Sequence, residues 1–198
     1  MKKIYAGVLI ALMNFTGMSL YAETRLSGIQ ANAIVKGASE IILSENSTVP
    51  TFINFSENAL PEAGDPDLWL RLNFGMSPDF GLTLLSRDND QIGFVHSRYQ
   101  QTLNGLPIEG TMWLVHAKNG KIQSMNGVLF PNLKVATTAI LGEPDALSKA
   151  LSKIGATKYK WQSADEEAWL KKEQNDPSAS FFPKGQLCYA YDSRKPET

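Results

Sequence analysis

Alternating apolar and polar positions between residues 92 and 129 predict three successive antiparallel strands. Asn104-Gly105 and Asn119-Gly120 mark two tight turns, because both dipeptides tolerate positive φ. Between the turns, large apolar residues alternate with polar ones at a period of two, a pattern that Gly110 interrupts: Ile108, Met112 and Leu114. We therefore expect strands near 92–103, 107–117 and 121–129.

The preceding residues predict further strands and one helix. Residues 27–45 form a candidate hairpin, and 48–57 follow as another strand. A helix is expected near 66–74, because Asp65 suits the N-cap, Pro66 the first helical position and Gly75 the C-cap. Its apolar residues are expected to face the sheet: Leu68, Leu72 and Trp69. One helix over an antiparallel sheet buries a single apolar face.

After residue 133 the pattern becomes helical. Leu147, Leu151 and Ile154 recur at spacings of four and three, which predicts a helix over 143–154 that ends at Gly155. Residues 156–162 predict a strand, and Ser163 with Glu166 forms a capping box that opens a helix over 164–173. In that helix Glu167 and Lys171 are spaced for an ion pair. A last strand is expected around Leu187 and Tyr189.

These elements predict an α+β fold made of two small modules. The first spans 23–132 and the second 133–198, each with an antiparallel sheet and one or two packed helices. The second module is expected to be incomplete at its C-terminus, because only one hairpin strand precedes the polar tail of the chain.

Residues 1–22 have the pattern of a cleaved export signal. Lys2 and Lys3 precede the mostly apolar run 4–20, and Ala22 offers a small residue before Glu23. A membrane anchor is the alternative interpretation, but the run is short for a bilayer and contains Asn14 and Thr16. We expect a secreted or periplasmic protein that no longer contacts the membrane after cleavage.

Charge and cysteine content exclude some functional classes. Without Lys2 and Lys3 the chain has 17 basic and 20 acidic residues, so nothing indicates the basic face of a nucleic-acid binder. Cys188 is the single cysteine, which excludes an intramolecular disulfide, and we interpret it as a packed strand residue.

The sequence predicts no catalytic residue, metal or cofactor. Neither histidine begins an H-E-x-x-H motif, since His96 precedes Ser97 and His116 precedes Ala117. The two histidines lie on adjacent predicted strands, where histidines are more often polar packing residues than ligands. Asp88 and Asp90 lack the further spaced oxygen ligands of a calcium loop, which favours a solvated turn.

The region 96–127 also resembles the fungalysin/thermolysin propeptide domain, a pro-region module of secreted zinc metalloproteases. Ten positions carry this resemblance: His96, Arg98, Gln101, Gly105, Pro107, Gly110, His116, Gly120, Asn126 and Gly127. The residues that follow are similar to a PepSY domain in the order of their elements and in a few positions: Tyr159, Trp161, Glu167, Lys171, Pro183 and Leu187.

The resemblance implies a non-enzymatic pro-region that assists the folding of a thermolysin-like catalytic domain and inhibits it, in cis or in trans. Candidate contacts for that partner are Tyr159, Trp161, Glu167 and Lys171. Trp161 has a second interpretation, as a residue packed under the helix over 143–154. His96, Arg98 and Gln101 are interpreted as hydrogen-bonding residues that hold the sheet together rather than as partner contacts.

Two accounts of the chain stay open at this point: a truncated zymogen, or a stand-alone pro-region. An exported non-enzymatic module that binds a peptide or small ligand is the alternative function.

Overall fold

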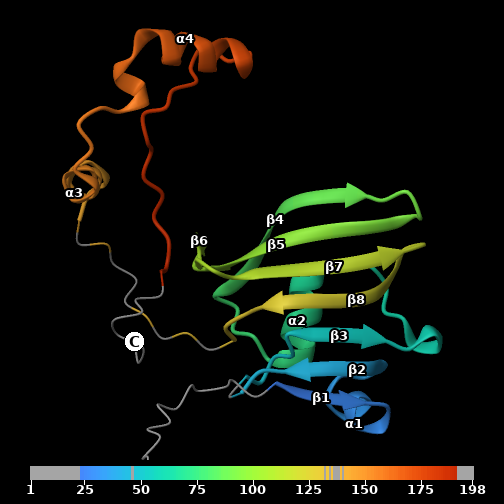
Figure 1. Ribbon diagram of the computed structural model, residues 1–198. Helices are drawn as coiled ribbons and strands as arrows, with labels where there is room; N and C mark the ends of the chain where they lie inside the picture. Colours follow the sequence, from blue (N-terminus) through green and yellow to red (C-terminus); the bar gives the residue numbers. More distant parts are fainter. Residues whose placement is uncertain are drawn as a thin grey trace, which may run out of the picture.

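The structure, a computed structural model, describes residues 23–45, 47–131, 133, 135, 139 and 141–190. The predicted export signal at 1–22 lies outside the described residues. Within the described part of the chain, no helix is both long and apolar enough to cross a membrane. The fold class is α+β, as the sequence predicted: an eight-stranded antiparallel sheet together with four α-helices in the same described part (Figure 1).

The sheet follows the order β1-β2-β3-β8-β7-β5-β4, with β6 paired to β5. Its strands are β1 (Thr24–Ser27), β2 (Ala38–Leu43), β3 (Phe52–Phe55), β4 (Phe80–Asn89), β5 (Phe94–Leu103), β6 (Leu106–Pro107), β7 (Met112–Lys118) and β8 (Lys121–Val128). The helices are α1 (Ile29–Ile34), α2 (Pro66–Phe74), α3 (Glu143–Ile154) and α4 (Ala164–Glu173), with short 3-10 turns η1 (Glu57–Ala59) and η2 (Lys160–Gln162).

The three strands expected from alternation are confirmed as β5, β7 and β8. Gly105 and Gly120 have φ of 77° and 74°, and the asparagine before each also has positive φ, which is the geometry of a type I′ turn. The expected strand over 107–117 is divided in the structure. Gly110, with φ of 76°, breaks it, so that the short β6 precedes the longer β7.

The expected hairpin over 27–45 is wrong in its first half. Ser27 ends β1, and the next residues form α1 before β2 returns antiparallel to β1. Ala31 and Val35 are both fully buried, and their spacing of four residues suits a helical turn rather than a strand. Gly28 and Gly37 have positive φ at the two ends of this excursion.

Helix α2 has the predicted bounds and caps but presents a different face. The Asp65 side chain accepts hydrogen bonds from the N–H groups of Asp67 and Leu68, and Gly75 is left-handed. Leu68 and Leu72 are exposed, which corrects the expected face. Leu70 is fully buried instead, and Trp69 packs partly buried against the core.

The core lies between the sheet and α2, which sits behind the middle strands in Figure 1. Its largest fully buried side chains come from both layers: Trp113, Ile41, Ile53, Leu70, Met125, Gln101, Val35 and Pro50.

Helices α3 and α4 are confirmed, but the strands expected beside them are not. Residues 160–162 form η2, in which the N–H of Tyr159 donates to Gln162 Oε1, so the expected strand over 156–162 is wrong. Of the last expected strand, the described residues show only an isolated parallel bridge between Tyr189 and Ile108. Cys188 is therefore exposed rather than packed in a strand. The division into two modules stays a prediction.

Candidate functional site on the polar face of the sheet

One face of the sheet carries a row of polar side chains. Residues that face each other across strands share a face, and the register joins seven of them in sequence: Ser27, Glu40, Asn54, Ser124, His116, His96 and Asp88. All seven are half-buried or exposed, whereas the alternating residues of the central strands form the core. We call this side, opposite α2, the polar face.

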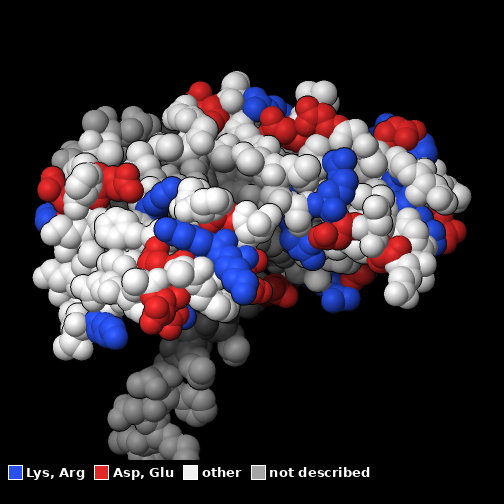
Figure 2. All heavy atoms as spheres, turned by 90° about the horizontal axis from the view of Figure 1, so that it is seen from above, with Lys and Arg blue, Asp and Glu red and all other residues white. Residues whose placement is uncertain are grey.

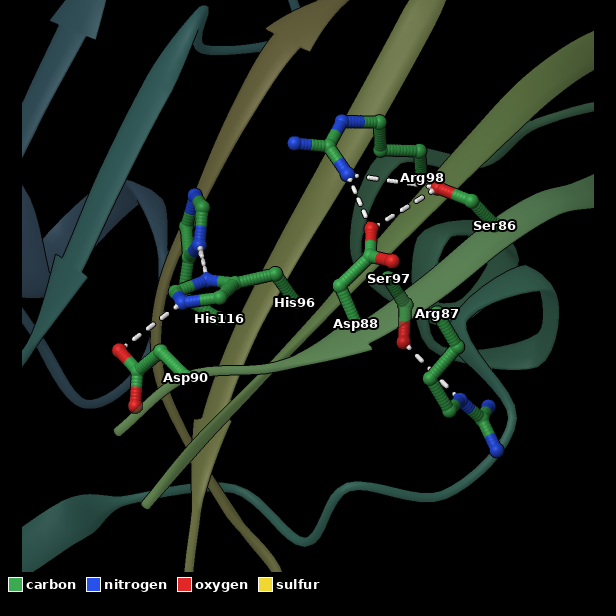
Figure 3. A network of polar contacts seen from close by, with 8 residues as sticks. All are labelled: Ser86, Arg87, Asp88, Asp90, His96, Ser97, Arg98 and His116. Carbon is green, nitrogen blue, oxygen red and sulfur yellow. Dashed lines mark hydrogen bonds and ion pairs between the residues drawn. The ribbon is translucent and has the colours of Figure 1, made fainter. Parts of the chain in front are cut away.

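Two histidines meet in the middle of this row. His96 in β5 and His116 in β7 are direct cross-strand partners, and their Nδ1 atoms lie 2.6 Å apart. The outer nitrogen of His96, Nε2, lies 3.2 Å from Asp90 Oδ2. The outer nitrogen of His116, Nε2, lies 2.8 Å from Asn126 Oδ1 in β8. The four side chains therefore form one continuous chain of polar contacts, most of which is seen in Figure 3.

Asp90 is held in position by the turn between β4 and β5. Its Oδ1 accepts hydrogen bonds from the N–H groups of Ile92 and Phe94, at 2.9 and 2.8 Å. Desolvation acts to raise the pKa of this carboxyl, but the hydrogen bonds from Phe94, His96 and Ile92 outweigh it and hold the pKa below its ordinary value. An ionised Asp90 thus faces His96.

Arg98 lies on the same face, next to the histidines. Its Nη1 donates to Asp88 Oδ2 at 2.6 Å and to Ser86 Oγ at 3.3 Å (Figure 3). Both charged side chains are substantially exposed, so the pair contributes little to stability, about 0–1 kcal/mol. Its main effect is local: it neutralises Asp88 beside the histidine pair.

Gln101 points to the opposite side of the sheet, because it is an odd number of residues from His96. It is completely buried, and its amide makes two hydrogen bonds to the backbone of Phe130, one with the N–H and one with the C=O. Gln101 therefore fixes the segment that leaves β8, while His96 and Arg98 face the other way. The structure separates these three residues, which the sequence interpretation had grouped.

Gly127 is the motif position with the strictest steric requirement. Its φ is 147°, and a Cβ built there would lie 1.9 Å from the carbonyl oxygen of Met112 in the neighbouring strand. Only glycine permits β7 and β8 to approach this closely.

Residues 80–129 match the family model described as Fungalysin/Thermolysin Propeptide Motif. This part of the chain is a propeptide motif of that family. It runs from the first residue of β4 to just beyond β8, and it contains all ten positions on which the resemblance rested.

Three curated proteases are similar to parts of the chain. Bacillolysin of Bacillus amyloliquefaciens is 26% identical over 201 aligned residues, which cover 96% of this chain and 35% of bacillolysin. The thermostable neutral protease of Geobacillus stearothermophilus is 31% identical over 74 residues, or 34% of this chain and 14% of that protein. Thermolysin of Alicyclobacillus acidocaldarius is 32% identical over 56 residues, or 28% and 10%. The chain thus spans about a third or less of each relative's length.

The propeptide motif also provides the contact with the C-terminal segment. The loop after β6 contains Pro107 and Gly110, and it receives Tyr189 through two backbone hydrogen bonds. The N–H of Tyr189 donates to Pro107 O at 2.8 Å, and the N–H of Glu109 donates to Tyr189 O at 2.7 Å. Motif residues therefore shape the place where the second half of the chain returns to the sheet.

The four candidate partner contacts lie in that second half, and three of them make internal contacts. Tyr159 and Trp161 stack at 4.3 Å, and the Tyr159 hydroxyl donates to Leu151 O. Glu167 accepts from the N–H of Phe181 and forms no ion pair with Lys171, which is exposed. Trp161 lies edge-on to Phe182 rather than under α3 alone. The four residues thus belong to one neighbourhood, around 181–182.

Sequence reasoning missed two parts of these sites. Asp90 was interpreted only as part of a turn, although its place six residues before His96 in a tight β4–β5 connection was a usable signal. Trp169 and Phe181, which stack at 6.5 Å beside the candidate partner contacts, were not identified. Trp169 is 55% exposed, which is unusual for tryptophan.

Charges do not form a patch of one sign. Figure 2 shows lysine and arginine side chains interspersed with aspartate and glutamate on the side seen there. Within the described residues, no group of three or more metal-ligating side chains is assembled.

Proposed function

We propose that the chain is an exported pro-region that binds a thermolysin-like metalloprotease domain, assists its folding and holds it inactive. The observation that carries this proposal is the propeptide motif over 80–129, which occupies β4, β5, β7 and β8 of a well-formed sheet. The similarity to three metalloproteases over parts of their length supports it. The sequence itself contains no H-E-x-x-H.

Folding assistance follows from preferential binding. A partner that binds only the native-like protease domain stabilises it by about 2.7 kcal/mol when its concentration is 100 times the dissociation constant. A covalently attached pro-region acts at an effective concentration on the order of millimolar. The same surface inhibits the protease when it covers the active-site cleft.

The contact surface is assigned to the second half of the chain. Tyr159, Trp161, Glu167 and Lys171 surround 181–182, where Phe182 and Trp169 leave large apolar areas exposed. Exposed aromatic side chains next to charged ones are typical of the centre and rim of a protein interface. Export by the signal over 1–22 places the pro-region in the same compartment as a secreted protease.

The decisive experiment adds the purified chain to a thermolysin-like catalytic domain and measures peptidase activity and refolding yield. We expect inhibition and a higher yield at micromolar concentrations. Trp161→Ala weakens both effects, whereas Ile154→Ala, an exposed apolar residue outside the assigned surface, does not. A verified folded sample that changes neither activity nor yield contradicts the proposal. A longer chain that joins both parts tests the action in cis.

One observation favours a different function. A groove of about 400 Å³ lies between α3 and the returning residues 183–187, lined mainly by apolar atoms, with Leu147 and Leu187 among its residues. A binding module for an apolar peptide would use this groove. Leu147→Asp abolishes peptide binding under this alternative and leaves protease inhibition unchanged, so the two functions are distinguishable.

A further inference from the structure

The polar contacts of the histidine pair specify how many protons it holds. Asp90 is an ionised carboxylate, which only accepts, so Nε2 of His96 has to be a donor. The atom that faces Nε2 of His116 is the carbonyl oxygen of Asn126, so this nitrogen is a donor as well. Both outer nitrogens therefore carry protons.

The two inner nitrogens face each other at 2.6 Å, where one lone pair has to be opposed by one proton. Three protons on four ring nitrogens make one imidazolium and one neutral imidazole. We propose that His96 and His116 share a single proton, and that gain or loss of this proton switches the hydrogen bonding of the polar face. This inference does not depend on the proposed function.

The distance distinguishes a proton from a metal ion. Two nitrogens bound to zinc at about 2.0–2.1 Å in tetrahedral geometry lie about 3.3 Å apart. The observed 2.6 Å is too short for that arrangement and suits a strong N–H···N hydrogen bond.

The charged groups around the pair favour one added proton over two. Asp88 in β4 is opposite His96 but is neutralised by Arg98 in β5. Lys118 in β7 lies over the Phe94 ring, which stacks on His96, and adds positive charge nearby. Ser124 and Asn126, which face the pair from β8, are uncharged. Asp90 remains as the countercharge for one imidazolium.

The sign of the pH dependence follows in both directions. A second proton places two donors and two positive charges face to face, so the unfolded chain takes it up more readily. Stability therefore falls as the pH drops below the ordinary histidine range, near 6.5. Loss of the shared proton leaves two lone pairs opposed, or Asp90 facing a bare nitrogen. The folded chain resists this loss, so stability also falls as the pH rises above that range.

Nuclear magnetic resonance of the histidine rings in the full chain tests the proton count directly. At pH near 6.5 we expect long-range ¹H–¹⁵N spectra to show His96 protonated on both nitrogens, and His116 neutral with its proton on Nε2. Two neutral rings under these conditions, which a reversed Asn126 amide would produce, overturn the proposal. Stoichiometric zinc binding that shifts both rings also overturns it.

Urea unfolding between pH 4.5 and 8.5 tests the consequence. For the natural chain we expect a maximum near pH 6.5 and a change in the folding equilibrium constant of at most about tenfold per pH unit on either side. His116→Gln should flatten the histidine-dependent part of this curve. Ser124→Ala, directly opposite His116, should lower stability equally at every pH. Identical curve shapes for the natural chain and His116→Gln contradict the proposal.

Discussion

At the scale of single residues, the motif positions have different physical roles. His96, His116 and Asn126 make polar contacts on one face, whereas Gln101 is buried on the other. Gly127 is required by the close approach of two strands. The motif is therefore mainly a set of requirements for forming and joining β5, β7 and β8, and few of its side chains are free for a partner.

Gly127→Ala should strongly destabilise the fold. The new Cβ meets the Met112 carbonyl oxygen, and the backbone conformation alone costs on the order of 1–3 kcal/mol in a non-glycine residue. Gly105→Ala is the matched control, because it has positive φ but no atom within 4 Å of the added Cβ. Urea unfolding compares them, and equal losses in the two variants argue against the steric explanation.

Gln101→Met should also lower stability, although the side-chain volume is nearly conserved. The N–H and C=O of Phe130 lose their partners, and each buried polar group left unsatisfied costs about 1–3 kcal/mol. Gln123→Met, at a partly exposed position, should cost far less. Faster hydrogen exchange of the Phe130 amide in Gln101→Met alone identifies the cause, and unchanged exchange there refutes it.

At the scale of elements, strands and turns were predictable where local chemistry determines them. Asn104-Gly105 and Asn119-Gly120 specify turns by backbone conformation, so β5, β7 and β8 follow from the sequence. The face of α2 was not predictable, because its closely spaced apolar residues fit several faces, and packing against the sheet selects Leu70. The histidine contact required the exact β5–β7 register, which alternation alone does not provide.

The cap of α2 gives a prediction at this scale. Asp65→Ala removes the acceptor for the N–H groups of Asp67 and Leu68 and should cost about 1 kcal/mol. Asp165→Ala, in the first turn of α4, has the same charge change without a capping contact. Its cost is expected to be only a few tenths of a kcal/mol. Chemical denaturation of both variants checks the order, which a larger loss for Asp165→Ala would reverse.

At the scale of the whole molecule, burial is distributed unevenly. The buried apolar cluster belongs to the sheet, α1 and α2, while α3 has no buried residue. Beyond residue 139, apart from Tyr189 packed against the core, the buried hydrophobic residues of the described part are Leu170 and Ala179. Since buried apolar area provides most of the stabilising free energy, α3 and α4 are held more weakly than the sheet.

Native-state hydrogen exchange should therefore divide the chain in two. We expect the amides of α3 and α4 to open at a lower free energy than those of β5, β7 and β8, because few buried apolar contacts hold them. A thermolysin-like catalytic domain, when added, should slow exchange in α4 and around 181–182, where the proposed contacts lie, and leave the central strands unchanged. Equal protection of the helices and the sheet in the chain alone contradicts the first expectation. Slowed exchange confined to the polar face, with α4 unaffected, would move the proposed contact surface from the second half of the chain to the sheet.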